Sequence, residues 1–241
     1  MKTAVVLATA LLIGASLAPA DSSGKLTVYM GGKPVANESY SIQSADGKIE
    51  INGSGAADMG ILKITIDQFK VVTDARYHPL EAAAKAQMGK VNMAILTTFS
   101  DDKANNKIDS GQGPTSKEDA IHGDDLVINT NLPICAWSML FPRVKLDSTT
   151  PQEFHAYIIG QKEVPLTVTS KGKETVEFDG KSEELSHVAA SLPLQEDKTT
   201  DIDFWINDAG KIIKAVVPSQ SVEVYQQGYA PKPKPAPAEG K

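Results

Sequence analysis

Cysteine is almost absent from this chain of 241 residues, in which Cys135 is the only one. An intrachain disulfide is therefore impossible. The chain does not need one, because a polypeptide of this size buries roughly 70% of its unfolded surface when it folds. Cys135 lies inside an apolar run, and a free cysteine in such surroundings is usually buried. We expect it to be a small hydrophobic core residue and not a reactive thiol.

Arginine is also scarce. Arg76 and Arg143 are the only two, and acidic residues outnumber Lys and Arg by 30 to 24. Surfaces that bind nucleic acid cluster basic side chains against the phosphates, and the lysines of this chain form no such stripe. The composition therefore argues against nucleic acid as a partner.

Motifs for catalysis and metal binding are lacking. The chain has no G-x-S-x-G elbow and no H-E-x-x-H pair among its four histidines. The segment His122-Gly123-Asp124-Asp125 offers an imidazole and two carboxylates, but an ordinary polar turn is the favoured interpretation, because one short cluster rarely completes a coordination shell. The acidic stretch that begins at Asp101 lacks the alternating oxygen ligands of an EF-hand loop. We therefore assign no catalytic residue, no metal site and no cofactor.

Long apolar runs are confined to the N-terminus. Lys2 precedes the apolar stretch Ala4 to Ala18, and Ala18-Pro19-Ala20 places small residues where a signal peptidase cleaves. Residues 1–20 are thus predicted to be a signal peptide, which makes the protein exported, either periplasmic or secreted. The alternative, an uncleaved anchor, is disfavoured because about 15 apolar residues fall short of the roughly 20 that span a bilayer. The next apolar window, Leu132 to Phe141, is shorter still, so the mature chain is expected to have no transmembrane segment.

The dominant pattern after residue 20 is a period of two. Leu62, Ile64 and Ile66 alternate with polar residues, and similar alternation recurs at 91–95, 154–158, 188–194, 202–206, 213–217 and 222–224. Such alternation predicts strands with one packed face and one wetter face. After Ile66 the phase changes, since Phe69 and Val71 are apolar on the other parity. One extra residue in a strand has this effect, so we predict a β-bulge near Gln68.

Turn residues separate the predicted strands and favour hairpins. They occur at Asp46-Gly47, Asn52-Gly53, Lys171-Gly172, Asp179-Gly180 and Asp208-Ala209-Gly210. Sequential hairpins predict an antiparallel meander. Helices are expected at two places only. The alanine-rich segment His78 to Met88 has Pro79 in its first turn, and Leu132 to Phe141 is either a short helix, which we favour, or a buried strand.

Two further segments lack the strand pattern. Residues 101–119 are polar with almost no apolar residue, and they predict a long loop. Residues 230–241 are rich in Pro and Lys and predict a disordered, extended tail. Residues 21–229 are therefore expected to form a single antiparallel β domain.

Four side chains are tentative ligand contacts. Trp205 lies on the strand face opposite its Ile and Phe neighbours, so it must be covered by the protein or by an apolar ligand, or stay exposed. Coverage by the protein is favoured, because Trp is usually largely buried. Trp137, Met139 and Phe141 either line a pocket or pack in the core, and core packing is again favoured.

A family resemblance rests on the C-terminal third of the chain. The strand-turn-strand from Asp203 to Lys214 and the terminal strand Ser221 to Tyr225 resemble the last strands of exported bacterial half-barrel proteins related to the lipoprotein carrier LolA, a superfamily with uncharacterised members. Tyr40 to Ile42 with Asp46-Gly47 resembles their opening hairpin. The resemblance implies one curved antiparallel sheet, an unclosed barrel, with one or two short helices plugging its concave side. In the carriers, that side holds lipid acyl chains.

These observations predict a non-enzymatic periplasmic binding or carrier protein for an apolar or amphipathic molecule such as a lipid. Two alternatives stay open. In the first, the chain is a cell-envelope scaffold that binds another envelope protein through its surface, edge strands and tail. In the second, it is a hydrolase with dispersed carboxylates, because the paired acids of glycosidases can come from distant strands.

Overall fold

The computed structural model describes residues 21–60, 62–122, 126–129, 133–195 and 198–231. The predicted signal peptide and most of the predicted tail lie outside the described residues. No helix in the described part is long and apolar enough to cross a membrane.

The described residues form one sheet of 15 strands. The strands are β1 (Ser22–Met30), β2 (Lys33–Ala45), β3 (Lys48–Asp58), β4 (Lys63–Asp74), β5 (Pro79–Met88), β6 (Val91–Ser100), β7 (Lys103–Asp109), β8 (Pro114–Ala120), β9 (Leu126–Asn129), β10 (Gln152–Ile158), β11 (Lys162–Phe178), β12 (Lys181–Gln195), β13 (Lys198–Ile206), β14 (Ile212–Val217) and β15 (Val222–Gln226). Within the described residues, 3-10 segments accompany them: η2 (Ile134–Met139), η3 (Phe141–Arg143) and η4 (Pro218–Gln220).

The strand order explains how the sheet curves. It runs from β8 down to β1, continues with β15 beside β1, and runs down again to β9. Neighbouring strands are antiparallel except for β9, which pairs in parallel with β10. Because β8 and β9 are both edges, the sheet is an unclosed barrel, which confirms the predicted fold class.

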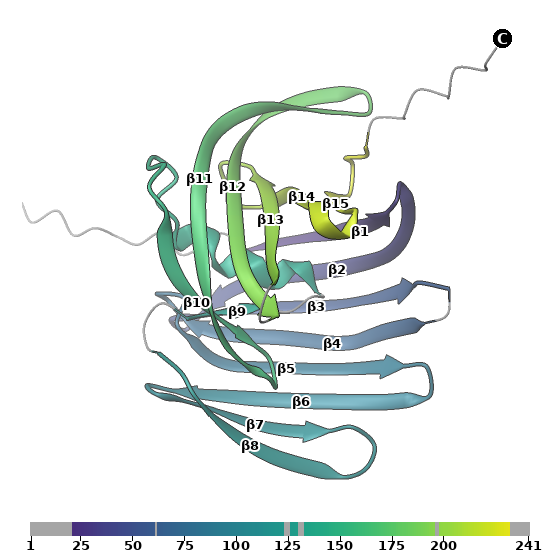
Figure 1. Ribbon diagram of the computed structural model, residues 1–241, viewed down its shortest axis with the longest axis vertical. Coiled ribbons are helices and arrows are strands. Elements are labelled where there is room, and N and C mark those ends of the chain that lie inside the picture. Colours follow the sequence, from purple (N-terminus) through teal and green to yellow (C-terminus); the bar gives the residue numbers. More distant parts are fainter. Residues whose placement is uncertain (1–20, 61, 123–125, 130–132, 196–197, 232–241) are drawn as a thin grey trace, which may run out of the picture.

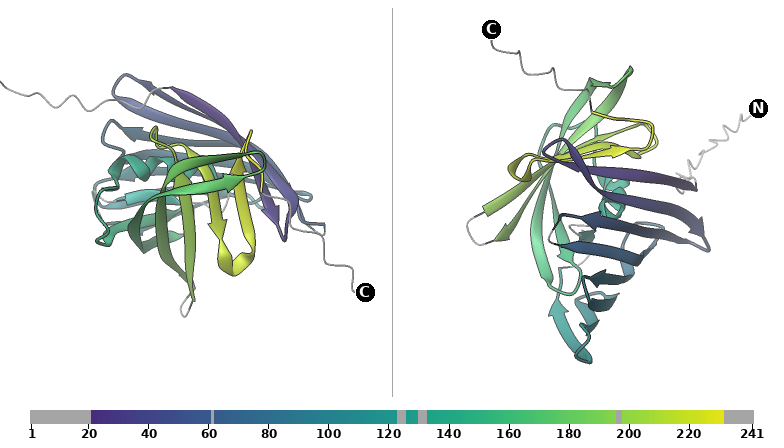
Figure 2. Two further views of the ribbon diagram at one scale, coloured as in Figure 1. Left: turned by 90° about the horizontal axis from the view of Figure 1, so that it is seen from above. Right: turned by 90° about the vertical axis from the view of Figure 1, so that its right-hand side faces the viewer.

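The sheet has two arms that face each other. The first arm (β1–β8) and the second arm (β9–β15) join where β1 pairs with β15, and their strands run at a steep angle to each other (Figure 1). The 3-10 segments η2 and η3 lie between the arms (Figure 2). They are the plug that the sequence predicts, although the helical part begins at Ile134 and is of the 3-10 type.

Side-chain alternation places one row of buried residues across the concave face of the first arm. Ile51, Val71, Ala82, Thr97 and Asn106 are paired in register from β3 to β7, and all are buried. Because the row continues into β7 with polar members, the concave face is apolar near the middle of the arm and polar near its free edge.

The segment His78 to Met88 is a strand, so the predicted helix is wrong. The Asp74 carboxylate accepts hydrogen bonds from the backbone N–H groups of Arg76 and His78, at 2.8 and 2.9 Å, and turns the chain back as β5. In β5 the alanines at alternate positions 82, 84 and 86 face the concave side, and Ala82 is fully buried there. The sheet's need for small inward side chains overrides the helical propensity of alanine.

Residues 101–119 form β7, β8 and their turns, so the predicted long loop is wrong. Inward positions of β7 are Ala104, Asn106 and Ile108. Only one of these is large and apolar, and the alternation is therefore invisible to a search for hydrophobic periodicity.

Most of the predicted turns are confirmed, and two are wrong. Asp46-Gly47, Asp179-Gly180 and residues 208–210 join adjacent antiparallel strands. Asn52-Gly53 and Lys171-Gly172 instead lie inside β3 and β11, where the strand registers shift. The bulge predicted near Gln68 is confirmed by a register shift between Ile66 and Gln68.

Candidate functional site

A buried carboxylate anchors the plug to the first arm. Glu38 of β2 is only 3% exposed, and its two oxygens accept hydrogen bonds from the backbone N–H groups of Ile134 and Cys135 at 2.7 and 2.8 Å. These groups belong to the first turn of η2 and have no intrahelical partner. Burial raises the pKa of Glu38 above its ordinary value of 4.5.

Cys135 itself packs onto the sheet. The thiol is fully buried, as predicted, and burial beside Glu38 raises its pKa. A Cβ atom at Gly53 would come within 3.1 Å of the sulfur. Gly53 therefore leaves room on β3 for the plug, and the buried Cys135 side chain also hydrogen-bonds to Glu38.

Three of the predicted ligand contacts belong to the plug. Trp137, Met139 and Phe141 are all buried. The rings of Trp137 and Phe141 pack on Phe204 of β13, with centroids 5.3 and 5.2 Å apart. Their surroundings are side chains of the protein itself, and a role in lining a ligand stays a prediction.

Trp205 lies apart from the other three. It follows Phe204 on β13 and points to the opposite face, where its ring stacks on His187 at 4.5 Å. The ammonium of Lys214 sits 4.4 Å from the ring centroid, and the indole N–H donates to the carboxylate of Glu174. The protein's own side chains thus cover Trp205 in part, as favoured from the sequence.

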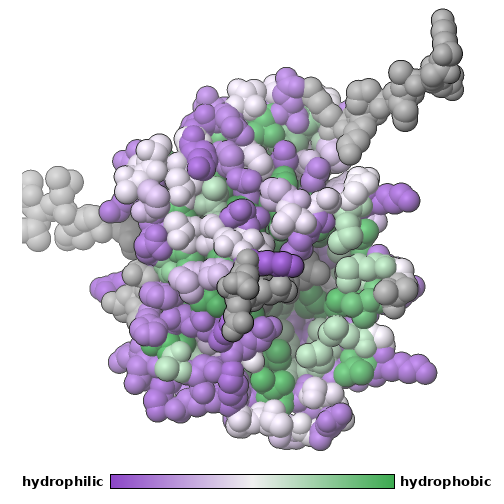
Figure 3. Space-filling view, in the orientation of Figure 1, coloured by the Kyte–Doolittle hydropathy of each residue, from purple (hydrophilic) through white to green (hydrophobic). Residues whose placement is uncertain are grey.

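An open apolar surface lies beyond the plug. We call this surface the trough. It consists of inward-facing side chains near one end of β4–β7, namely Ile64, Ile66, Ala84, Ala86, Met93, Ile95 and Ile108. All of them are half-buried. Met88 and Val91, 37% and 48% exposed, form its outer rim. Figure 3 shows apolar side chains gathered in this hollow over the right-hand part of the first arm.

The trough has two defined ends. At one end is a cavity of about 10 Å³, roughly the space of one water molecule, lined in part by Ala57, Ile64, Ile66, Pro133 and Glu38. The trough therefore narrows beneath the start of the plug. At the other end is the β10–β11 turn, where a Cβ atom on Gly160 would lie 3.3 Å from Ile95 and 3.4 Å from Ile108.

A second hollow has a different lining. It has a volume of about 300 Å³ and touches β4 to β8. Its lining includes Ala83, Leu96 and Lys107, which are paired in register on the face opposite the trough, together with Lys85 and Asp109. This outer hollow is an alternative binding surface on the same strands. It shares Ala84, Ile95 and Ile108 with the trough, and its charged residues Lys85, Lys107 and Asp109 distinguish it.

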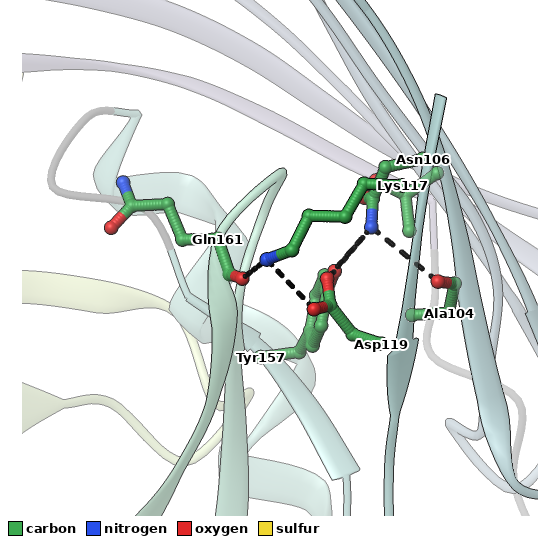
Figure 4. A network of polar contacts seen from close by, with 7 residues as sticks. Ala104, Asn106, Lys117, Asp119, Tyr157 and Gln161 are labelled. Atoms are coloured by element: carbon green, nitrogen blue, oxygen red, sulfur yellow. Dashed lines mark hydrogen bonds and ion pairs between the residues drawn. The ribbon is translucent and has the colours of Figure 1, made fainter. Parts of the chain in front are cut away.

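Polar side chains connect the free edge of the first arm to the second arm, and we call this contact the seam (Figure 4). The hydroxyl of Tyr157 accepts a hydrogen bond from Asn106 at 2.7 Å and donates to Asp119 at 2.8 Å. Lys117 pairs with Asp119 at 2.7 Å and donates to the backbone carbonyl of Gln161. Burial raises the pKa of Tyr157, which keeps its hydroxyl protonated as a donor.

The seam also contains a group of potential metal ligands. His122 follows β8, His155 lies on β10 and Glu163 lies on β11, and one ligand atom of each lies within 4.8 Å of the other two. The sequence groups His122 with its chain neighbours 123–125, which lie outside the described residues. His155 and Glu163 are not predictable as its partners, since no sequence spacing connects them to His122.

The comparisons with known proteins bear on the fold. No family profile and no curated protein matches the chain. A solved structure, a β-barrel-like protein of domain of unknown function DUF1849 from Brucella abortus, is similar with a TM-score of 0.57 and 12% identity, over 86% of this chain and 93% of that one. A DUF1089 family protein from Pseudomonas aeruginosa gives a TM-score of 0.46 and 13% identity, over 76% and 90% of the two chains. The first likeness shows that this barrel-like fold occurs in a bacterial protein of very different sequence. The LolA-like resemblance stays a prediction.

Proposed function

We propose that the protein binds the apolar chain of an amphipathic molecule in the trough. The observation that carries the proposal is the composition of the trough, because each inward side chain of β4–β6 over this stretch is apolar and, apart from Phe69, none is fully buried. Soluble proteins rarely leave such a continuous apolar surface open unless something binds there.

The shape of the trough suits a linear chain. It crosses four adjacent strands, which corresponds to about 14 Å at roughly 4.8 Å per strand spacing. Covering it gains about 25 cal/mol for each Å² of apolar surface removed from water. Charged groups lie in the turns next to it: Lys63 pairs with Asp58 at 3.0 Å across the β3–β4 connection, and Lys90 lies in the β5–β6 turn. These groups would contact the polar head of the ligand.

A pair of neighbouring substitutions tests the site. Ala86 faces the trough and Lys85 faces the outer hollow. We expect Ala86→Trp to weaken binding of the apolar fluorophore N-phenyl-1-naphthylamine at least tenfold, and Lys85→Trp to leave binding unchanged. Loss of binding in Lys85→Trp alone would assign the ligand to the outer hollow. No binding by the unmodified protein would refute the proposal.

We further propose that the protein acts outside the cytoplasm, in the periplasm or as a secreted protein. The support is the sequence of residues 1–20 alone. N-terminal sequencing of protein from cells that produce the full chain should find Asp21 as the first residue. A protein that keeps Met1 and stays in the cytoplasmic fraction would contradict this.

A further inference from the structure

Three potential metal ligands meet where the two arms approach each other. His122 comes from the end of the first arm, directly after β8 and Ile121, while His155 and Glu163 come from β10 and β11 of the second arm. A bound ion would therefore connect elements that the strand order places at opposite ends of the sheet.

Glu163 is held in place for this role. Its side chain is 9% exposed, and its Oε2 atom accepts a hydrogen bond from the backbone N–H of His122 at 2.7 Å. This bond orients the other oxygen, Oε1, towards the two imidazoles, 2.8 Å from Nδ1 of His122 and 3.9 Å from Nε2 of His155. Contacts to the second oxygen of a carboxylate commonly fix metal ligands in this manner.

The imidazoles are also positioned side by side. Their rings stack with centroids 5.6 Å apart and an interplanar angle of 24°. The Nε2 atom of His155 faces Glu163, whereas its Nδ1 atom is buried without a hydrogen-bond partner among the described residues and is not the atom offered to the ion.

Two of the three ligand–ligand distances are close to those that a metal ion requires. The third, between the two imidazoles, is within 4.8 Å. Ligands about 2.0–2.1 Å from a tetrahedral zinc ion lie about 3.3 Å from each other. The His122–Glu163 distance of 2.8 Å would lengthen and the His155–Glu163 distance of 3.9 Å would shorten, each by roughly half an ångström. The side chain of His122 is 78% exposed and has room to make this adjustment.

We propose that His122, His155 and Glu163 bind one divalent transition-metal ion of the zinc class, and that the ion clasps the seam. Two imidazole nitrogens and one carboxylate suit Zn²⁺ and its transition-metal neighbours, whereas Mg²⁺ and Ca²⁺ require oxygen ligands. Three protein ligands leave the fourth position to a water molecule. This site is separate from the trough, and the inference does not depend on the proposed function.

Titration of the untagged mature protein with ZnCl2 in a calorimeter tests the site. We expect one ion per chain, with affinity lowered at least tenfold in His122→Ala, His155→Ala and Glu163→Gln. The control is His78→Ala, which removes a histidine that also pairs with a carboxylate, Asp74, at 3.0 Å. Failure of the unmodified protein to bind Zn²⁺ stoichiometrically, or an equal loss in His78→Ala, would overturn the proposal.

Thermal unfolding separates a clasp from an ordinary ion pair. Saturating Zn²⁺ should raise the Tm of the unmodified protein by about 5 °C or more, because an ion that binds only the folded chain stabilises it. Glu163→Gln should lose this rise while keeping its circular dichroism spectrum. If the variant lowers the Tm equally with and without Zn²⁺, the group is only a structural ion pair and the proposal is wrong.

Discussion

The concave face of the first arm has a covered half and an open half, and both are apolar over β4 and β5. Under the plug, Ile51, Val71 and Ala82 are completely buried. Beyond the plug, Ile64 and Met93 point to the same side of the sheet and remain half-buried. The difference is therefore not in the strands but in the cover, which the plug and the second arm supply to one half only.

This contrast assigns separate roles to the two halves. The covered half completes the hydrophobic core, and Glu38 fixes the cover in place. The open half adds little to the core and is available to a ligand. The same substitution made in each half should therefore change the free energy of unfolding by different amounts.

The largest expected effect comes from truncating one isoleucine in each half. Ile51→Ala should lower the free energy of unfolding by about 3–4 kcal/mol, because it leaves a cavity in a packed core. Ile64→Ala should lower it by about 1 kcal/mol or less, because its side chain still meets solvent. Urea unfolding of both variants measures the difference. Equal losses would show that the trough is core and not an open site.

The second effect concerns the anchor of the cover. Glu38→Ala should destabilise the protein by about 2–3 kcal/mol, because two buried N–H groups lose their acceptor. The matched control is Glu50→Ala on β3, whose exposed pair with Lys70 at 3.6 Å contributes about 1 kcal/mol or less. A Glu38 variant as stable as the control would mean that the plug is held without the carboxylate.

A smaller effect is expected at the seam. Tyr157→Phe removes the hydroxyl that bonds the second arm to Asn106 and Asp119 of the first arm, and should cost about 1–2 kcal/mol. Tyr225→Phe is the control, since its hydroxyl bonds to Glu223 on the same strand. It should cost about half as much or less. If the two costs are the same, the seam does not hold the arms together.

The smallest effect is a dependence on pH. The pKa of Glu38 is raised in the folded protein, so the folded state binds this proton more tightly than the unfolded state. The stabilisation from this tighter proton binding is fully present below about pH 4.5 and is lost as the pH rises through the folded-state pKa. The total loss is about 1.4 kcal/mol for each unit by which the folded-state pKa exceeds the unfolded-state pKa. The difference in unfolding free energy between the unmodified protein and Glu38→Gln should change in this direction. A difference that is constant from about pH 4.5 to 8 would contradict the raised pKa.

The period-two pattern predicted the architecture because most strands bury large apolar side chains on one face. It missed β5, where alanine is the inward residue, and β7, where Asn106 is. In both strands the type of inward residue depends on the side chains that face it across the barrel. The local sequence carries no information about those side chains. The seam, the Glu38 anchor and the His122 group were unpredictable for the same reason, since their members are far apart in sequence.

The open half of the concave face, and not the covered half, is the surface that we propose meets the ligand. Isoleucine methyl NMR tests this directly, with the apolar fluorophore as the bound molecule. We expect nuclear Overhauser contacts from the probe to the methyl groups of Ile64, Ile66 and Ile95, and none to Ile51 or Ile206. Contacts to the buried isoleucines, or to none of the trough isoleucines, would contradict it.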